Sequence, residues 1–292
     1  MRVRQALLAA MPLLLLAGCA AGGPGGDVPA QTVGAQGRRY QTTGTVLQSR
    51  DHGPQLCLTA MATSFPPACR GLPITNWRWD QVQGQQTAHG TTWGTYRLVG
   101  TYDGASFTVI RADLAPPVRR PSHEEQFKDE PKSPCPEPDG GWPVPDPARR
   151  SERDLAPVTQ AARAQPDFAG VWLSYLEPMG HNVAEDPGEF VLNVAFTGEL
   201  ARHETELRPR WGGRLCVTRQ QRTYRELLRI QRELHGATGT ELGLQVLGSG
   251  IDESANAVSL EVLVLEERAR QALGARFGVG AVQATARLTP VT

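Results

Sequence analysis

The chain has 292 residues, of which 40% are hydrophobic, and its 30 basic and 30 acidic residues leave no net charge at pH 7. This length is enough for two domains, each with a core of its own. Removal of Arg2 and Arg4 with an N-terminal signal leaves 28 basic and 30 acidic residues. The chain therefore has no excess of basic residues, and neither nucleic acid nor an anionic membrane surface is indicated as a partner.

The N-terminus carries an apolar run, Ala6–Leu16, which ends in Leu16-Ala17-Gly18-Cys19. A run of about eleven residues is too short to cross roughly 30 Å of hydrocarbon as a mature helix. The pattern resembles a bacterial lipoprotein signal peptide. The resemblance implies that residues 1–18 are removed, that Cys19 is acylated, and that residues 19–39 tether the protein to the extracytoplasmic face of the cell membrane. The alternative is an ordinary secretory signal in which Cys19 has no role.

The chain contains five cysteines, and assigning Cys19 to lipid leaves an even number, as expected in an oxidising compartment. We expect Cys57 to pair with Cys69 in one domain and Cys135 with Cys216 in the next. Four cysteines allow three pairings, so the sequence does not prove this connectivity. Metal coordination is the alternative, but no Cys-x-x-Cys pair occurs. Disulfides are therefore the favoured reading.

Residues 40–114 are predicted to form a small all-β domain. Thr91–Thr101 alternates between two faces, and Asp103-Gly104 is a tight-turn signal before a return strand at Ser106–Ile110. Further strand patterns occur, including residues 46–47 and 55–58. The domain would then have about five strands, which we expect to form an OB-like barrel. The domain resembles small all-β modules of uncharacterised actinobacterial secreted proteins, a resemblance that names no activity. It is carried by Gly44-Thr45-Val46, Pro54-Gln55-Leu56-Cys57-Leu58 and Gly100-Thr101-Tyr102-Asp103-Gly104.

Residues 115–134 are predicted to be a linker. The wider stretch Ala115–Pro147 is interrupted by many prolines, which cannot propagate a helix or a central strand. Cys135–Trp142 is interpreted as a strap that begins the second domain.

Residues 135–292 are predicted to form an α+β domain with an internal repeat. Leu207 and Trp211 have counterparts 66 residues later in Leu273 and Phe277. Each of the two copies of the repeat is predicted to have the order strand, strand, helix, strand. Two ferredoxin-like halves with helices on one face would satisfy this ββαβ pattern. Helices are expected at 154–164, 198–211 (after an N-cap at Thr197), 222–235 and 266–277. Strands are expected at 170–176, 190–196, 215–218, 242–248, 257–265 and 281–288.

The second copy also resembles the pro-domains of actinobacterial secreted serine proteases. Arg222–Leu288 has the same loose order of helix, hairpin, helix and strand, with the hairpin turn at Ala255-Asn256-Ala257. The resemblance implies a folding aid or an inhibitor, but no protease domain follows.

Tryptophans are the candidate binding residues. Trp77, Trp79 and Trp93 fall in the all-β domain, and an exposed cluster would suit stacking on carbohydrate or peptide. Trp77 and Trp79 would share one face of a strand. The alternative is that this face is the core of the barrel. Trp172 and Trp211 belong to the repeat pattern and are interpreted as core.

Catalytic residues remain unknown at this level. Gly248-Ser249-Gly250 lacks the spacing of a nucleophile elbow, so Ser249 is interpreted as a loop residue. His203 is predicted to be a solvent-facing helix residue rather than a metal ligand. The polar segment around His181 and Glu185 is expected to be a plain loop. Among the acids considered for glycoside cleavage, namely Asp80, Asp103, Asp113, Glu185 and Glu189, sequence places no pair across a cleft. No cofactor, metal or nucleic acid is expected.

Three functional hypotheses follow. The favoured one is a non-enzymatic lipoprotein of the cell envelope, anchored to the membrane, that binds or scaffolds a cell-wall or protein partner. The second is an envelope hydrolase acting on cell-wall glycan or peptide. The third is a folding aid or inhibitor related to protease pro-domains.

Overall fold

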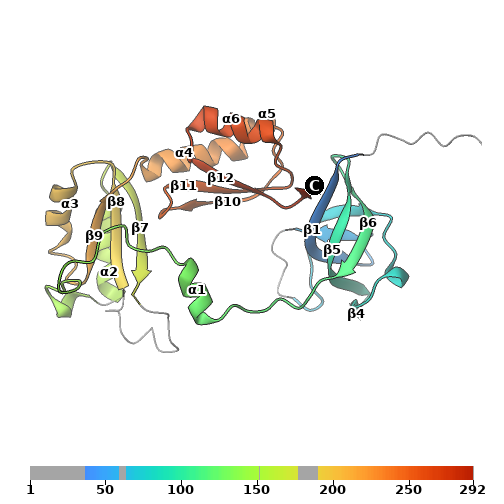
Figure 1. Ribbon diagram of the computed structural model, residues 1–292, viewed down its shortest axis with the longest axis horizontal. Coiled ribbons are helices and arrows are strands. Elements are labelled where there is room, and N and C mark those ends of the chain that lie inside the picture. Colours follow the sequence, from blue (N-terminus) through green and yellow to red (C-terminus); the bar gives the residue numbers. More distant parts are fainter. Residues whose placement is uncertain (1–36, 59–63, 151, 177–189, 292) are drawn as a thin grey trace, which may run out of the picture. The chain divides into compact units, whose positions relative to one another are not determined.

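A computed structural model describes residues 37–58, 64–150, 152–176 and 190–291. The predicted signal peptide, Cys19 and most of the predicted tether lie outside the described residues. The described part is α+β, as predicted, with strands in three sheets (Figure 1). We call residues 37–114 the β unit and the two later repeats the first and second copies.

The β unit contains six strands. They are β1 (Arg39–Gln48), β2 (Gln55–Cys57), β3 (Leu72–Thr75), β4 (Gln86–Ala88), β5 (Thr91–Tyr102) and β6 (Phe107–Leu114). Pairing runs from β1 through β2, β3, β6 and β5 and returns to β1, so five strands close a ring. Within the ring, β3 and β6 are parallel and the other neighbours are antiparallel. The mainly β character is confirmed, but β1 is much longer than predicted, and β3 and β4 were not predicted.

The side chains of β5 alternate between a buried and an exposed face, as the sequence indicates. Tyr96 and Leu98 are buried in the core of the ring, whereas Arg97 between them is exposed. The β5–β6 register shifts at Val99 and Gly100. A Cβ on Gly100 would lie 2.2 Å from the Thr108 carbonyl oxygen, so this bulge requires glycine for close backbone approach.

The linker contains a helix, contrary to prediction. Helix α1 (His123–Asp129) begins with a capping box, in which the Ser122 hydroxyl accepts from the Glu125 amide and the Glu125 carboxylate accepts from the Ser122 amide. This motif satisfies two amides that have no partner within the helix. The prolines bound the helix on both sides without entering it.

Two copies of a helix-strand-strand-helix-strand order follow. The first contains α2 (Glu152–Arg163), β7 (Phe168–Tyr175), β8 (Phe190–Phe196), α3 (Leu200–Leu207) and β9 (Leu215–Arg219). The second contains α4 (Tyr224–His235), α5 (Ala237–Glu241), β10 (Val246–Asp252), β11 (Ala257–Val262), α6 (Glu267–Phe277) and β12 (Val282–Ala286). In each sheet the middle strand is antiparallel to the first strand and parallel to the last. The two sheets therefore share the same strand pairing, and each is preceded by a helix.

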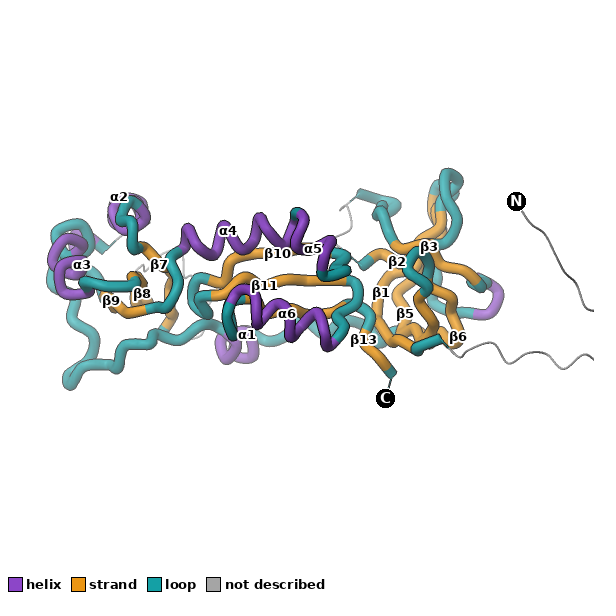
Figure 2. Tube along the Cα trace, turned by 90° about the horizontal axis from the view of Figure 1, so that it is seen from above, coloured by secondary structure: helices purple, strands orange, loops and turns teal. Residues whose placement is uncertain are grey.

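In the second copy the helices cover one face of the sheet (Figures 1 and 2). Leu227, Ile230 and Leu234 of α4 are buried with Val258 and Leu260 of β11. These α4 positions follow helical spacing, and the Thr223 hydroxyl caps the helix by accepting from the Glu226 amide.

Two local predictions in this region were wrong. The strand predicted at 242–248 begins only at Val246, as β10. The helix predicted after Thr197 begins later, and its N-cap is Glu199, which has a positive φ of 46° and makes no side-chain capping bond. Thr197 instead uses its amide to donate to the Asp167 carbonyl.

A strap, residues 130–149, covers the face of the β7–β8–β9 sheet that the helices leave open. The Ser174 hydroxyl of β7 donates to the Pro131 carbonyl at 2.7 Å, and a disulfide joins Cys135 to Cys216 of β9. At the far end, the Gly212 amide donates to Arg149. The second disulfide of the described chain, Cys57–Cys69, closes a loop of the β unit.

The C-terminal end of the chain returns to the β unit. Strand β13 (Thr289–Pro290) pairs antiparallel with β1, with Thr289 opposite Gln41. Leu263 and Leu288, both about 1% exposed or less, are part of the core cluster of the β unit.

Candidate functional site

The three tryptophans proposed as a binding face do not lie together. Trp77 follows β3 in a loop and Trp79 begins a short 3₁₀ turn, so neither belongs to a strand. Both rings pack against the core of the β unit. Trp93 lies on β5 next to Gly94 and on the opposite face from Tyr96. The prediction that Trp77 and Trp79 share one face of a strand was therefore wrong, because β3 ends before Trp77.

Trp77 and Trp79 form an aromatic cluster with Tyr96. The Trp77 ring meets those of Trp79 and Tyr96 edge to face, with centroids 5.2 and 5.1 Å apart. Burial raises the pKa of the Tyr96 phenol, whose oxygen has no hydrogen-bond partner among the described residues. Trp79 Nε1 donates to Gln48 at 2.8 Å. This arrangement favours the core interpretation for two of the three tryptophans.

Trp93 has a different environment. Its ring meets that of Phe65 edge to face, with centroids 5.8 Å apart, and Phe65 is 74% exposed. The pair offers an apolar contact on the surface, beside Gln86, which lies opposite Trp93 on β4.

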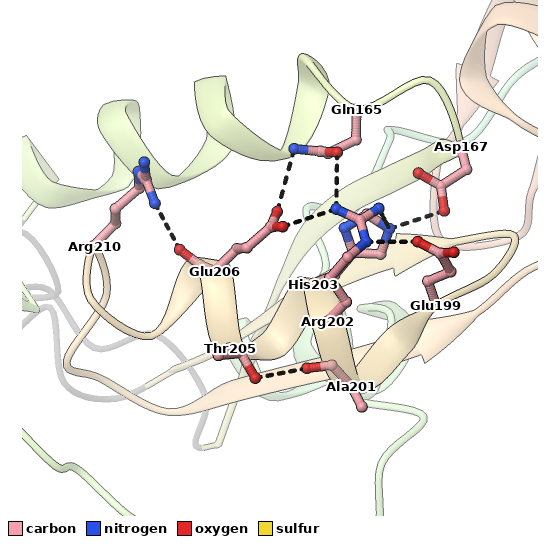
Figure 3. Close-up of polar contacts among 9 residues, drawn as sticks. All are labelled: Gln165, Asp167, Glu199, Ala201, Arg202, His203, Thr205, Glu206 and Arg210. Carbon is pink, nitrogen blue, oxygen red and sulfur yellow. Dashed lines mark hydrogen bonds and ion pairs between the residues drawn. The ribbon is translucent and has the colours of Figure 1, made fainter.

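His203 is buried, contrary to the sequence interpretation. Its side chain is 1% exposed and its ring stacks on Phe196 at 3.6 Å between centroids. Nε2 lies 2.8 Å from Oδ2 of Asp167 (Figure 3). The pair links α3 to the residue that precedes β7, and at 1% exposure the ring is out of reach of a ligand, which indicates a structural role.

Charged residues surround this pair. Arg202 donates to Glu199 at 2.5 Å and to Glu206 at 2.8 Å (Figure 3). These hydrogen bonds raise the pKa of the Arg202 guanidinium. Arg202 is thus engaged by two carboxylates, while Oδ1 of Asp167 is buried without a hydrogen-bond partner among the described residues.

Ser249 lies in strand β10 and not in a loop. Its hydroxyl accepts from Gln231 Nε2 at 2.9 Å and lies 2.7 Å from His235 Nε2. A nucleophile and base need a third group that orients the base. Among the described residues, no carboxylate bonds to His235, so the pair is incomplete as a catalytic set.

The candidate site is a pocket of about 380 Å³ between the strap and the first copy. Residues of the strap form one wall, the β7–β9 sheet and the residue after β9 form the floor, and the turn after β10 forms the other wall. The lining residues are Pro131, Lys132, Pro134, Trp172, Thr218, Arg219, Gln220, Ser254 and Ala255.

Sheet geometry and the hairpin turn set the positions of these groups. Side chains alternate along a strand, so Trp172 faces the strap while its neighbour Leu173 joins the core under the helices. Gln220 Nε2 donates to the carbonyls of Glu253 and Ser254 at 2.9 and 3.2 Å. The Gln220 amide is therefore held with its nitrogen toward the turn and its oxygen free.

Two residues that line the pocket each have a buried side-chain atom without a hydrogen-bond partner in the described chain. The atoms are the donor Nε1 of Trp172 and the acceptor Oε1 of Gln220. Three more unpartnered buried atoms belong to the strap or the covered sheet face, namely Glu130 Oε2, Ser133 Oγ and Asn193 Oδ1. Buried polar groups normally have partners, but these atoms have almost no accessible surface and so lie beneath the surface of the pocket.

Two cations line the same pocket. Lys132 Nζ lies 3.4 Å from the centroid of the Phe127 ring and donates to the Phe127 carbonyl. Arg219 Nη1 donates to the Thr197 carbonyl at 2.8 Å. Neither makes an ion pair with a carboxylate of the described residues. Arg219 lies opposite Phe196 and two residues after Val217, both packed in the core under the helices, so its side chain leaves β9 on the face away from the strap.

This pocket was not predicted from the sequence. Trp172 was predicted to lie in the core, but the residue is only half-buried. Trp211 is buried, as expected, at 1% exposure. Arg219 ends strand β9 and Gln220 follows it, and Lys132 lies in the proline-rich stretch. No spacing rule joins these segments, and only the fold brings them together.

Three of the acids considered for glycoside cleavage belong to the described residues, and they do not face one another across a cleft. Asp80 pairs with Arg78 and Asp113 with Arg111, while Asp103 accepts from the amides of its own turn, which lowers its pKa. His181, Glu185 and Glu189 lie outside the described residues.

The described residues contain neither a candidate metal centre nor a candidate membrane span. Among the described residues, no group of three or more His, Cys, Asp or Glu side chains is placed to hold a metal ion. None of the described helices has the length and apolarity needed to span a membrane. Comparisons with protein-family models and with curated proteins found no match to this chain.

Proposed function

We propose that this protein is a lipid-anchored binding protein of the cell envelope, held on the extracytoplasmic face of the membrane through Cys19, and that the strap pocket is its ligand site. The anchor rests on the Leu16-Ala17-Gly18-Cys19 sequence. Two disulfides in the folded part agree with an oxidising compartment.

The composition of the strap pocket carries the proposal of binding. Its lining combines the half-buried Trp172 ring, two prolines, Lys132 and several uncharged polar residues. It contains no Asp, Glu, His or Cys, which are the commonest acids, bases and nucleophiles of enzyme sites. Such a lining fixes the orientation of a small molecule and supplies no evident group that transforms it.

We also propose a finer description of the two folded regions. The closed ring with parallel β3 and β6 supports an OB-like barrel for the β unit. The duplicated strand-strand-helix-strand order supports two related halves of the ferredoxin-like kind, each with one further helix in front. These are fold-level statements and carry no ligand by themselves.

The anchor is tested by mass spectrometry of protein extracted from membranes. We expect a chain that begins at Cys19 and carries acyl groups, because each buried CH₂ contributes about 0.8 kcal/mol to membrane binding. The Cys19→Ser variant serves as the control and should be found without acyl groups and released from the membrane. A full-length chain with unmodified Cys19 would overturn the anchor.

Binding is tested by thermal melting of the full chain with the soluble fraction of an enzymatic cell-wall digest. A ligand that binds only the folded state raises the melting temperature by mass action. We expect a rise for the native protein and none for Trp172→Ala, once circular dichroism has shown that the variant is folded. An equal rise in both would place the ligand elsewhere and contradict the strap pocket as the site.

A further inference from the structure

We propose that one outer face of the β unit docks on the anionic lipid headgroups of the membrane that the acylated Cys19 enters. This inference rests on the anchor of the proposed function and adds the surface of the folded part that meets the lipid. Three observations lead to it: the uneven distribution of charge along the chain, the arginines that this face gathers, and the place where the predicted tether joins the β unit.

The neutral total charge of the chain conceals a difference between the β unit and the rest. Residues 37–114 contain seven basic and four acidic residues, whereas residues 19–36 and 115–292 together contain 21 basic and 26 acidic residues. An anionic surface attracts a positive part of a protein even when the whole protein carries no positive excess. The total charge therefore does not argue against membrane contact through the β unit.

The outer face of β1, β5 and β6, which lie side by side (Figure 1), presents exposed arginines. Tyr40 of β1 and Leu98 of β5 are buried in the core of the β unit. Because side chains alternate along a strand, Arg39 and Arg97 point outward, and both are exposed. Arg97 lies opposite Thr43, four residues along β1 from Arg39, so about 13 Å of strand separates them. Charges spread in this way suit an extended surface better than a single ion.

Strand pairing brings two further arginines to the same face. Arg111 of β6 lies opposite the residue that is two positions after Arg97, so these two arginines are diagonal neighbours about 7–8 Å apart. On the other side of β1, Thr289 pairs with β1, and Arg287 precedes it by two residues. Leu288 between them is buried in the core, which directs its neighbours outward.

Three of the four arginines line one groove of about 460 Å³, namely Arg97, Arg111 and Arg287. The lining also includes Thr43 and Thr289, and it contains no aspartate or glutamate. A guanidinium group binds phosphate through parallel N–H donors, and a hydroxyl can add a further hydrogen bond. The groove therefore offers a place for a phosphate headgroup within the larger basic face.

Two of the four arginines have acidic partners and two do not. Arg111 pairs through Nε with Asp113 at 3.0 Å, and Arg287 pairs through Nε with Glu261 at 2.6 Å. Both arginine side chains stay exposed, at 69% and 45%. Arg39 and Arg97 form no ion pair with a carboxylate of the described residues. The face therefore keeps a positive charge that the fold itself does not neutralise.

The predicted tether joins the β unit at this face. Residues 19–36 lie between Cys19 and the described chain, and β1 begins at Arg39. A segment of this length spans at most about 60 Å when fully extended, so an acylated Cys19 would confine the basic face to that distance from the headgroups. Confinement raises the effective concentration of the two surfaces. A weak electrostatic attraction is then sufficient to hold the face on the membrane.

The test is co-sedimentation of the mature chain, residues 19–292 with Cys19→Ser, with lipid vesicles. One set of vesicles contains phosphatidylcholine alone, and the other contains equal parts of phosphatidylcholine and phosphatidylglycerol. Because this chain has no acyl group, all binding comes from the protein surface. We expect binding to the anionic vesicles at low salt, little binding to the neutral ones, and loss of binding at about 1 M salt, where the Debye length is about 3 Å.

Three double variants identify the surface. Arg39→Gln with Arg97→Gln should lower the partition coefficient about thirtyfold, since each arginine near an anionic surface contributes about fivefold. Arg39→Lys with Arg97→Lys keeps both charges and should bind as the parent chain does. Arg50→Gln with Arg70→Gln is the matched control, because it removes two exposed arginines of the β unit that do not line the groove. It should cause a much smaller loss. Equal melting temperatures show that the variants are folded.

Several outcomes would overturn the docking face. Equal losses in the two glutamine variants would show that binding follows the net charge and not this face. Loss of binding in the lysine variant would indicate a site for a discrete anion that needs guanidinium geometry. Binding to dissolved polyglycerol phosphate that depends on Arg97, without binding to vesicles, would assign the face to a cell-wall polymer.

The anchor and the docking face fail separately. Acylated Cys19 in protein extracted from membranes, together with no binding of the unacylated chain to anionic vesicles, overturns the docking face and leaves the anchor. Unmodified Cys19, together with vesicle binding that depends on Arg39 and Arg97, overturns the anchor and leaves the docking face.

Discussion

Asn256 connects the β10–β11 hairpin to the start of α4 through its side chain. Its Oδ1 accepts from the Arg222 amide and its Nδ2 donates to the Arg222 carbonyl, both at 2.8 Å, in a buried position. Its φ of 51° is positive, a conformation that asparagine tolerates better than alanine does. We expect Asn256→Ala to lower the free energy of unfolding by about 3 kcal/mol, because two buried backbone groups lose their partners.

Urea unfolding of Asn256→Ala and Asn256→Gly separates the two contributions. Glycine accepts positive φ without strain, so Asn256→Gly should be less destabilised by about 1 kcal/mol. Equal stability of the native protein and both variants would contradict the role of the side chain.

Single residues were the least predictable from sequence. Helical spacing indicates which residues of α3 share a face, but the burial of His203 depends on Asp167 and Phe196, which lie on other elements. In the same way, Trp172 is a core position by repeat pattern and a pocket position because residues 130–134 cross it. Such contacts come from tertiary structure and leave no local periodicity.

At the scale of elements, the two disulfides should differ in their effect on stability. Cys135–Cys216 spans 81 residues and Cys57–Cys69 spans 12. A longer closed loop restricts the unfolded chain more, which in the chain-entropy account gives about 4.5 kcal/mol for the first and about 3 kcal/mol for the second. We expect Cys135→Ser with Cys216→Ser to be less stable in denaturant unfolding than Cys57→Ser with Cys69→Ser. The reverse order would show that the strap contributes little to the folded state.

Elements with a strong local pattern could be predicted, and short ones could not. The alternation of β5 and the capped, amphipathic α4 were recognised because packing follows the sequence period there. The strands β3 and β4 have only four and three residues, too few for a period. Helix α1 was missed although Ser122 and Glu125 have capping-box spacing, because the surrounding prolines were given more weight.

At the scale of the whole molecule, residues from both ends of the described chain complete the β unit. The Val291 amide donates to the Arg39 carbonyl at 2.9 Å, and Arg38 forms an ion pair with Glu266 at 2.6 Å. Residues 40–114 were predicted to be a separate domain because all strong strand patterns of the β unit lie within this range. A two-residue strand such as β13 has no signal that could reveal its partner.

Because β13 and Leu288 pack on the β unit, we expect a substitution near the C-terminus to destabilise the β unit. Leu288 is fully buried in the core that contains Tyr40 and Leu98, and its amide donates to the Leu263 carbonyl at 2.8 Å. We expect Leu288→Ala to cost about 3 kcal/mol, the usual range for a buried leucine being about 2–5 kcal/mol. Hydrogen exchange should show faster exchange of β1 and β5 amides, with the β7–β9 sheet unchanged.

Leu228 provides the matched control for this experiment. It is a leucine of α4 that is 36% exposed, so Leu228→Ala removes the same atoms and should change stability by about 0.5 kcal/mol or less. A loss of protection that is confined to β10–β12 in Leu288→Ala would show that the β unit folds independently of the C-terminal residues. Loss in β1 instead would show that the first and last strands of the described chain stabilise each other, because a core that includes Leu288 cannot keep its packing when that side chain is removed.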